Sequence, residues 1–268
     1  MKLGLLGFPV SHSRSPRLFA RLSRRLGRRI EYEAVAVRPG ALIPAVARAW
    51  NAGWRGANVT VPLKEEALAL CARLTPAARA VGAVNCLRFD RVLTGHNTDA
   101  EGLRDALRRA GVGVRGKSAL VFGAGGAARA AGWALGMEGA KSVRFSARTE
   151  ARGKTAAREL GKLFSGTRFA AGGAVRADIW INATPLGMKG FPDRDPAPKR
   201  LPPPSAAIDL VYGRRTAFQR RCAAQNASVT DGAAMLVFQA LRAWEFWNKP
   251  LGAGRRAALA EELIEVIS

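Results

Sequence analysis

The chain has few cysteines and histidines, and none of them has the spacing of a metal site or a disulfide framework. Its three cysteines, Cys71, Cys86 and Cys222, are far apart in the 268 residues and include no C-x-x-C pair. The two histidines, His12 and His96, are also distant from each other, which favours structural roles for both. Dispersed cysteines in an odd number are typical of a reduced protein. We therefore expect small buried thiols, no metal ion and a cytoplasmic location.

Long apolar segments are absent as well. No stretch of about 18 apolar residues occurs, so the sequence predicts no transmembrane helix and no membrane partner. The N-terminal MKLGLLGFPV combines one lysine with a short apolar run and lacks the longer apolar region and cleavage site of a signal peptide. We expect that run to be a buried strand, because 48% hydrophobic residues suffice for a sizeable core.

Acidic residues are scarce, since 20 Asp and Glu stand against 43 Lys and Arg, and the formal net charge is +23. Such a charge is typical of proteins that bind nucleic acids. The basic residues are dispersed, however, and neither zinc-finger spacing nor an RNP-like aromatic motif accompanies them. We expect a solvated basic surface that attracts anionic cofactors and substrates, with no specific nucleic acid as a partner.

Apolar segments of strand length alternate with segments of helical periodicity, which predicts an α/β fold. In the first part of the chain the predicted strands are 3–6, 31–37, 58–61, 86–89 and 92–95. Continuous apolar strands at 118–122, 142–146, 178–183 and 206–211 are typical of a parallel sheet. The sequence predicts an N-terminal α/β substrate domain over residues 1–100, completed by C-terminal helices in 233–268, and a Rossmann-type dinucleotide-binding domain over 101–232. We expect ligands to bind in a cleft between them.

A glycine-rich loop follows the predicted strand 118–122 and opens a helix. Gly123, Gly125 and Ala128 fit the G-x-G-x-x-A form of the dinucleotide fingerprint. The first glycine permits a tight turn, the second lets the backbone approach a pyrophosphate, and the alanine allows close packing of helix and strand. Free N–H groups at the helix N-terminus favour an anion there. The predicted cofactor-binding residues of this loop are Gly123, Ala124, Gly125, Gly126 and Ala127.

The end of the next predicted strand indicates which dinucleotide binds. An NAD site has an acidic residue there that bonds the ribose 2′-hydroxyl, whereas this chain has Arg148, Thr149 and Arg152. Guanidinium groups suit a 2′-phosphate because their planar donors contact two oxygens together. Glu150 lies between the arginines and is the acidic residue that could bond the ribose hydroxyl of NAD. We expect NADP (NADPH) as the cofactor.

Further polar residues follow the predicted strands and turns of the first domain. We expect Ser15 to be the N-cap of a helix whose first position is Pro16. Lys64 comes shortly after a predicted strand, and Asp99 lies at the predicted boundary between the domains. The polar residues that form this group are Ser13, Ser15, Thr60, Lys64, Asn85 and Asp99.

Short motifs extend along almost the whole chain, from Gly7 to about Gln239. Besides the glycine loop they are residues 7–16, 58–64, 82–85, 97–99, 182–188, 209–212 and 231–236. In this order they resemble the shikimate dehydrogenase family. The resemblance implies reversible hydride transfer between NADP(H) and shikimate or 3-dehydroshikimate, a step in the biosynthesis of chorismate and the aromatic amino acids. It is consistent with a monomer or a homodimer that binds these small molecules.

The resemblance also implies roles for individual residues. Lys64 and Asp99 would flank the reacting hydroxyl. The substrate would be bound by Ser13, Ser15 and Tyr212 at its carboxylate and by Thr60, Asn85 and Gln239 at its ring hydroxyls. The nicotinamide pocket would include Asn182, Ala183, Thr184, Gly232 and Met235. Purely structural alternatives remain open: Asn85 and Asn182 would then tie loops, and Tyr212 would be a core residue.

The chemistry of ketone reduction supports these roles. Arrival of a hydride places negative charge on the carbonyl oxygen, which an ammonium group such as that of Lys64 stabilises and protonates. Asp99 would hold the lysine and the substrate hydroxyl in line. Whether Lys64 transfers the proton or only orients and stabilises is left open, as is a plain ion pair between the two side chains.

Two other functions fit parts of the sequence. A quinate/shikimate or aminoshikimate dehydrogenase would differ at one substrate substituent and in cofactor preference. A non-catalytic basic nucleic-acid-binding or regulatory protein on the same fold belongs to another class, and intact Lys64 and Asp99 argue against it. The chain also departs from the family pattern: Ala147 replaces a usual Asn, Ala234 replaces a frequent glycine, and segment 212–216 is short and lacks a common proline. These departures leave cofactor affinity and substrate fit open.

Overall fold

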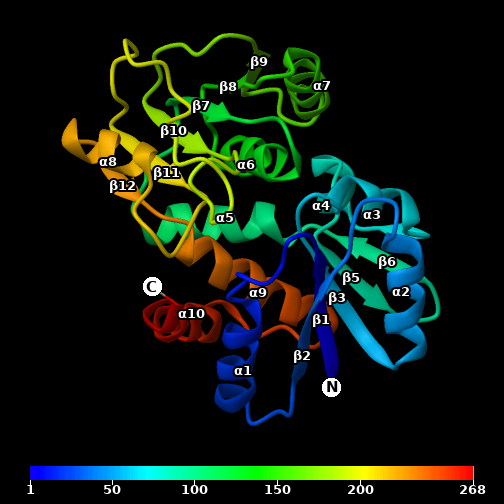
Figure 1. Ribbon diagram of the computed structural model, residues 1–268. Coiled ribbons are helices and arrows are strands. Elements are labelled where there is room, and N and C mark those ends of the chain that lie inside the picture. The colour runs from blue at the N-terminus through cyan, green and yellow to red at the C-terminus, as the bar shows by residue number, and fades with distance from the viewer. Residues whose placement is uncertain (268) are drawn as a thin grey trace. The chain divides into compact units, whose positions relative to one another are not determined.

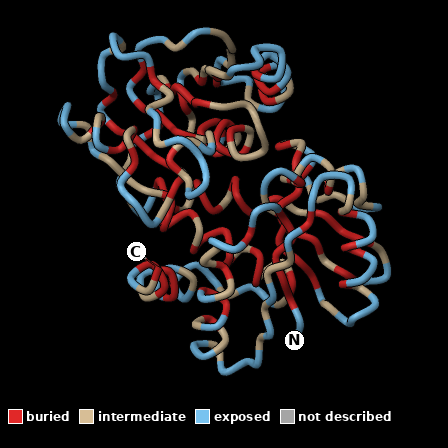
Figure 2. Tube along the Cα trace, in the orientation of Figure 1, coloured by how far each residue is buried: buried red, intermediate tan, exposed pale blue. Residues whose placement is uncertain are grey.

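The computed structural model describes residues 1–267, which form two compact units, each with a six-stranded sheet (Figure 1). Unit 1 contains Met1–Thr98 and Leu236–Ile267, and unit 2 contains Asp99–Met235. Buried residues follow the central strands of each sheet, and exposed residues follow the outer turns and helix faces (Figure 2). The predicted α/β class is confirmed.

The sheet of unit 1 is mixed. In spatial order its strands are β2 (Glu31–Ala36), β1 (Lys2–Gly7), β3 (Trp54–Val59), β5 (Cys86–Phe89), β6 (Leu93–His96) and β4 (Arg73–Leu74). Strands β1, β2 and β3 are parallel, whereas β5 runs antiparallel to β3. The carboxyl ends of β1 and β3 and the amino end of β5 therefore lie at one edge of the sheet, where loops with polar residues follow the strands.

Helices from both ends of the chain belong to unit 1. They are α1 (Ser15–Leu26), α2 (Leu42–Asn51), α3 (Lys64–Leu70), α4 (Pro76–Val81), the part of α9 (Ala233–Trp247) from Leu236 onward, and α10 (Ala253–Ile267). Phe19 of α1 is fully buried, stacks on Tyr32 with ring centroids 4.2 Å apart, and contacts Trp247 of α9. The Trp247 indole donates a hydrogen bond to the carbonyl of Leu87 at 2.8 Å. These contacts fix the end of α9 on the N-terminal sheet.

All six strands in the sheet of unit 2 are parallel. Their order is β12 (Ser228–Thr230), β11 (Ala206–Asp209), β10 (Ile179–Asn182), β7 (Ser118–Phe122), β8 (Ser142–Ser146) and β9 (Arg168–Ala171). The chain runs outward from β7 to β9, returns to β10 and then runs outward in the other direction. This is the doubly wound order of the Rossmann fold, in which ligands bind where the strand order reverses. That point lies between the carboxyl ends of β7 and β10.

Small residues bring the helices of unit 2 close to its sheet. These helices are α5 (Thr98–Arg109), α6 (Gly126–Met137), α7 (Glu150–Gly161) and α8 (Ala217–Ala224). A Cβ atom at Gly132 of α6 would lie 2.6 Å from the ring of Phe145 and 2.7 Å from Leu160. Ala128, which the fingerprint predicts as a packing residue, is fully buried. Helix α6 can approach β8 and α7 this closely because its buried face consists mainly of alanine and glycine.

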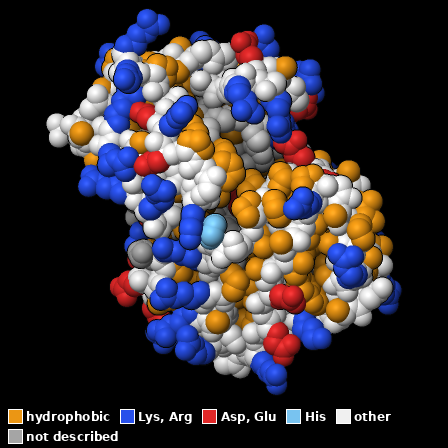
Figure 3. All heavy atoms as spheres, viewed as in Figure 1, with side chains coloured by type: hydrophobic (Ala, Val, Ile, Leu, Met, Phe, Trp, Pro, Cys, Tyr) orange, Lys and Arg blue, Asp and Glu red, His pale blue; other side chains and the backbone are white. Residues whose placement is uncertain are grey.

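The three cysteines are free thiols. Cys86 and Cys222 are buried and Cys71 is partly buried, in keeping with the core roles expected for them. Burial raises the pKa of Cys71 to about 11 and that of Cys222 to about 12, so the reactive thiolate is disfavoured at both sites. Within residues 1–267 no helix has the length and apolar character needed to cross a membrane. Lysine and arginine side chains are dispersed over the visible face of both units (Figure 3).

Candidate active site

The glycine loop lies at the reversal point of the parallel sheet. Gly123 follows β7 with a positive φ of 112° and donates its N–H to the carbonyl of Ser146 at 2.8 Å. A Cβ atom there would lie 3.1 Å from the carbonyl oxygen of Ala183, so only glycine fits without strain. A Cβ atom at Gly125 would meet no atom within 4 Å, which leaves open space over the N-terminus of α6. This is the arrangement that a pyrophosphate requires.

The residues predicted to select NADP lie after β8, the strand next to β7. Arg148 and Thr149 precede α7, Arg152 lies in its first turn, and all three are partly or fully exposed. The N-terminus of α7 adds a partial positive charge to the two guanidinium groups. Glu150 forms an ion pair with Lys154 at 2.9 Å along the same helix. The local charge at this strand end therefore favours a phosphate over an uncharged ribose.

The loop after β10 lies against the glycine loop and contains Ala183 and Thr184, which follow Asn182 at the strand end. The Asn182 side chain is fully buried, and its Nδ2 donates to Asp209 Oδ1 at 2.9 Å. Its Oδ1 accepts hydrogen bonds from Thr184 N at 3.1 Å and Thr184 Oγ1 at 2.7 Å. The side chain thus ties the loop, and a direct contact of this loop with nicotinamide stays a prediction.

Gly232 and Met235 follow β12, near the end of β11. A Cβ atom at Gly232 would lie 2.3 Å from the carbonyl oxygen of Leu210, so a side chain here would displace the backbone that continues from β11. Asp231 accepts a hydrogen bond from the N–H of Ala233 at 3.1 Å, just where α9 begins. Met235 is buried within the first turns of α9. Unit 2 therefore contains every residue predicted to bind the cofactor.

The expectation that Ser15 is the N-cap of the first helix is wrong. Helix α1 begins at Ser15, its N-cap position is Arg14, and no side chain forms the usual cap hydrogen bond. Pro16 is accordingly the second helical residue. Ser13 Oγ accepts the N–H of Ser15 at 3.2 Å, so the serine two positions earlier supplies the local bond. The helix starts sooner because the N–H of Leu18 already bonds the carbonyl of Arg14 at 2.9 Å.

The ends of β1 and β3 bring two of the predicted motifs together. A Cβ atom at Gly7 would lie 2.3 Å from the Thr60 methyl group, and Thr60 N donates to the carbonyl of Leu6 at 2.9 Å. Lys64 opens α3, and its carbonyl accepts the N–H of Val84 at 2.9 Å. The segments with Ser13, Thr60 and Lys64 thus all follow the same edge of the unit 1 sheet.

Asn85 ties several of these segments. Its carbonyl accepts the N–H of Val59 at 2.8 Å and Asn58 Nδ2 at 3.3 Å. Its Oδ1 accepts the N–H of Thr98 at 2.7 Å, and its Nδ2 donates to Thr98 Oγ1 at 3.0 Å. The structural role left open for Asn85 is present, while its contact with substrate stays a prediction. Thr98 directly precedes Asp99, so this bond fixes the backbone where α5 begins.

The remaining predicted residues are divided between the units. Gln239 lies in the unit 1 part of α9, is buried, and donates from Nε2 to the carbonyl of Leu236 at 2.8 Å. Tyr212 follows β11 in unit 2 and is partly buried. Lys64 belongs to unit 1, whereas the buried Asp99 belongs to unit 2. Joint action of this pair therefore stays a prediction.

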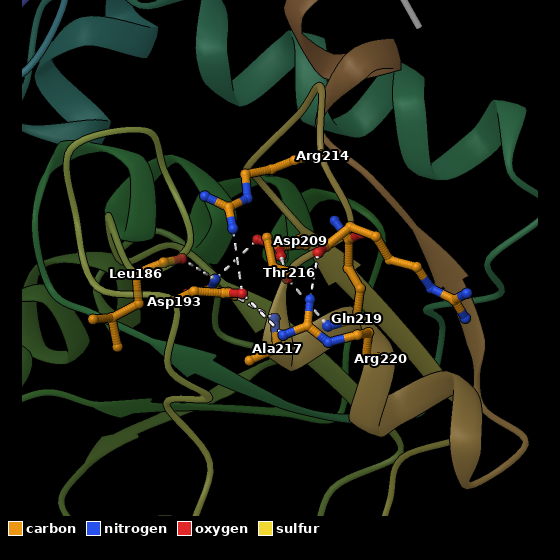
Figure 4. A network of polar contacts seen from close by, with 10 residues as sticks. Leu186, Asp193, Asp209, Arg214, Thr216, Ala217, Gln219 and Arg220 are labelled. Atoms are coloured by element: carbon orange, nitrogen blue, oxygen red, sulfur yellow. Dashed lines mark hydrogen bonds and ion pairs between the residues drawn. The ribbon is translucent and has the colours of Figure 1, made fainter.

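The buried Asp209 and Thr216 of unit 2 are among the polar residues that received no role from the sequence. Asp209 is fully buried at the end of β11 and accepts hydrogen bonds from Asn182, Val211 and Thr216 (Figure 4). Thr216 also caps α8, because its Oγ1 accepts the N–H of Gln219 at 3.2 Å. The only sequence signal for this network is an acidic residue at the end of an apolar strand, within the motif at 209–212.

The two histidines lie in different surroundings. Across residues 1–267, no three His, Cys, Asp or Glu side chains come together as a group that could hold a metal ion. His12 is exposed in the loop before α1. His96 Nδ1 is 2.8 Å from Thr75 Oγ1, and its ring lies 4.8 Å from that of Phe246. Burial, followed by the charges of Arg242 and Arg88, lowers the pKa of His96 from 6.5 to about 4.

This partly buried base is expected to make the protein acid-sensitive. The unfolded chain binds a proton at His96 below pH 6.5, but the folded chain does so only near pH 4. The contribution of neutral His96 to the free energy of unfolding is therefore complete above pH 6.5. As the pH falls toward 4, the free energy of unfolding decreases by up to about 3 kcal/mol. We expect His96→Gln to remove this component, measured as the free energy of unfolding of both proteins at pH 7 and pH 4.5. An equal loss of stability in the two proteins would contradict the prediction.

Comparisons with known proteins show the family of this chain. The family described as "Shikimate dehydrogenase substrate binding domain" matches residues 5–87. The shikimate dehydrogenase (NADP(+)) of Rubrobacter xylanophilus is 41% identical, and the alignment covers 97% of this chain and 95% of that protein. The protein of the same name from Anaeromyxobacter dehalogenans is 40% identical, and the alignment covers 91% of this chain and 90% of that protein.

A solved structure resembles the whole chain as well. Shikimate 5-dehydrogenase of Thermus thermophilus, crystallised with NADP(H) and shikimate, is 34% identical and superposes with a TM-score of 0.85. The match covers 98% of this chain and 99% of that protein. Because relatives of this identity span both compact units, the chain belongs to the shikimate dehydrogenase family.

Proposed function

We propose that this chain is an NADP-dependent oxidoreductase that reversibly reduces 3-dehydroshikimate to shikimate, in the biosynthesis of chorismate and the aromatic amino acids. The observation that carries the proposal is the glycine loop at the reversal point of the parallel sheet, followed at the next strand end by Arg148 and Arg152. The substrate is supported by relatives named shikimate dehydrogenase, which match more than nine-tenths of the chain.

The residues of this chain would bind and polarise the substrate. When bound, NADPH supplies the hydride. Ser13 and Ser15 would hold the substrate carboxylate, since both lie at the start of α1, where N–H groups and a partial positive charge favour an anion. The Lys64 ammonium would stabilise the negative charge that develops on the carbonyl oxygen and place a proton there. Asp99 would orient the lysine and the substrate hydroxyl.

Other residues would complete the substrate and cofactor sites. Tyr212 would assist at the substrate carboxylate, and Thr60, Asn85 and Gln239 would bind the ring hydroxyls. Residues 1–100 and 233–268 would form the substrate domain, and residues 101–232 the NADP domain. The free thiols, two of them buried, support a reducing, cytoplasmic location.

The reductive direction tests this proposal. Purified protein is incubated with 3-dehydroshikimate and NADPH, and the product is identified by chromatography against authentic shikimate. We expect shikimate to accumulate in equal amount to the NADPH consumed. NADPH consumption without shikimate, or no consumption at all, would refute the assignment.

A further inference from the structure

Asp209 is a buried acid whose bonding partners are all uncharged. Its side chain is fully buried at the carboxyl end of β11, where the strand register pairs it with Asn182 of β10. The carboxylate accepts hydrogen bonds from Asn182 Nδ2 at 2.9 Å, Val211 N at 3.1 Å and Thr216 Oγ1 at 2.5 Å. Burial raises its pKa to about 6. A buried charge balanced only by neutral donors is costly, so its presence calls for a role beyond packing.

On one side the carboxylate holds the loop that follows β10. Asn182 relays the contact, because its Oδ1 accepts both the N–H and the hydroxyl of Thr184. Thr184 Oγ1 in turn accepts the N–H of Leu186 at 3.2 Å, and Asn182 Nδ2 reaches the carbonyl of Leu186 at 3.3 Å. Between these residues, the carbonyl of Ala183 lies against Gly123 of the glycine loop. The chain of bonds therefore runs from Asp209 to the loop predicted to contact nicotinamide.

On the other side the same carboxylate holds the segment that follows β11. The bond from Val211 N sets the turn just before Tyr212, and Thr216 lies at the other end of this short segment. The Thr216 methyl group would lie 2.6 Å from a Cβ atom at Gly187, so the loops after β10 and β11 also pack directly on each other. One buried carboxylate thus links both loops.

A second carboxylate, Asp193, fastens the outer part of this network. It accepts the N–H of Ala217 at 2.8 Å and forms ion pairs with Arg214 at 3.4 Å and Arg220 at 2.9 Å (Figure 4). Hydrogen bonding at Ala217 and to Arg220 lowers the pKa of Asp193, so it stays ionised near neutrality. Asp193 lies toward solvent and holds the segment after β11 from outside, whereas the buried Asp209 holds the same segment from within.

We propose that Asp209 is a positioning residue for hydride transfer, which holds the loop 182–188 and the segment 210–216 in the arrangement that the nicotinamide and substrate require. The proposal rests on the proposed function. Asp209 acts through Asn182, Thr184 and the turn before Tyr212. Loss of its bonds is expected to misplace the reacting groups while the glycine loop and Arg148 still bind the rest of the cofactor.

The test compares Asp209→Asn with Asp178→Asn. Asp178 is the control because its carboxylate also accepts hydrogen bonds beside this sheet, from Ser118 N at 2.8 Å and Ser118 Oγ at 2.7 Å, but it is exposed and lies at the amino end of β10. We expect Asp209→Asn to lower kcat by about ten- to a hundredfold, since small misplacements of reacting groups have effects of this size. The dissociation constant of NADPH, followed by its fluorescence, is expected to change less than about threefold. The control should keep kcat within about twofold of the unmodified protein.

Two further measurements separate positioning from general loss of structure. Hydrogen exchange at the amides of Thr184, Leu186 and Val211 should become faster in Asp209→Asn and remain unchanged in Asp178→Asn. The double variant Asn182→Asp with Asp209→Asn swaps the two side chains, so that the amide at position 209 can donate to the carboxylate at position 182. We expect this variant to recover part of the lost kcat.

If kcat and the hydrogen-exchange rates of Asp209→Asn equal those of Asp178→Asn, the positioning role of Asp209 is overturned. The exchange measurement does not depend on turnover. An unmodified protein that fails to oxidise shikimate would therefore refute the proposed function, while the exchange result would still decide whether Asp209 holds the loops.

Discussion

Replacing Lys64 with alanine is expected to lower kcat for shikimate oxidation by roughly 10³-fold, the range of a general acid–base group that also stabilises charge. Lys64 opens α3 shortly after β3, and the bond between its carbonyl and the N–H of Val84 is kept in the alanine variant. We therefore expect the protein to fold normally and the dissociation constant of shikimate to change less than about threefold, because the proposed carboxylate and hydroxyl contacts come from other residues. Single-turnover kinetics and equilibrium binding measure the two quantities separately.

The control for this experiment is Lys249→Ala, which removes an exposed lysine from the same compact unit. It corrects for the loss of one positive charge from a very basic protein. Lys64→Arg adds a second comparison, because arginine keeps the charge but does not give up its proton. Substantial activity in Lys64→Arg would assign charge stabilisation to the residue, and activity as low as in Lys64→Ala would favour proton transfer. Unchanged turnover in Lys64→Ala would remove the residue from the chemistry.

The double substitution Arg148→Ser with Arg152→Ser is expected to lower kcat/KM for NADP⁺ by at least about 100-fold, since bonds between guanidinium and phosphate contribute about 1.5–3 kcal/mol each. Both arginines lie at the strand end beside the glycine loop, where the N-terminus of α7 adds its own positive charge. The value for NAD⁺, which lacks the 2′-phosphate, should change less than about threefold. Initial rates with each cofactor at saturating shikimate give the two values.

Arg168→Ser is the matched control for cofactor selectivity. Arg168 is also an exposed arginine of unit 2, but it lies at the start of β9, at the amino ends of the parallel strands. It should leave the ratio of kcat/KM for the two cofactors unchanged. An equal loss for NADP⁺ and NAD⁺ in the double variant would mean that the arginines do not contact the 2′-phosphate. Because Ala147 stands where the family that the chain resembles usually has Asn, we expect these arginines to be the main local source of selectivity.

The features that the sequence predicted well are encoded locally. The glycine loop, the apolar strands of unit 2 and the position of the arginines after β8 each lie within a few consecutive residues, so their spacing alone was informative; the contact of the arginines with the cofactor stays a prediction. Helix α7 was not predicted because its buried face consists of Gly153, Ala156, Ala157 and Leu160, which give little apolar periodicity. Strand β3 begins at Trp54, before the predicted residue 58, because Gly56 fits against the indole of Trp247 from the far end of the chain.

The parts of the site that escaped prediction depend on contacts between distant residues. Asn182 and Asp209 are adjacent only because β10 and β11 pair in one register. Asn85 and Thr98 meet only because β5 and β6 form an antiparallel pair, which brings the two strand ends together. For both asparagines the sequence indicated importance but left binding and structural roles open. The structure gives each side chain a tying role within its own unit.

The assignment as an NADP-dependent shikimate dehydrogenase is tested most directly by one set of initial rates. The purified protein is mixed with shikimate or quinate, each with NADP⁺ or NAD⁺, and formation of reduced nicotinamide is followed by absorbance. The account predicts that kcat/KM is highest for shikimate with NADP⁺, by at least about tenfold over every other pair. The highest value for quinate with NAD⁺, or no reduction with any pair, would contradict it.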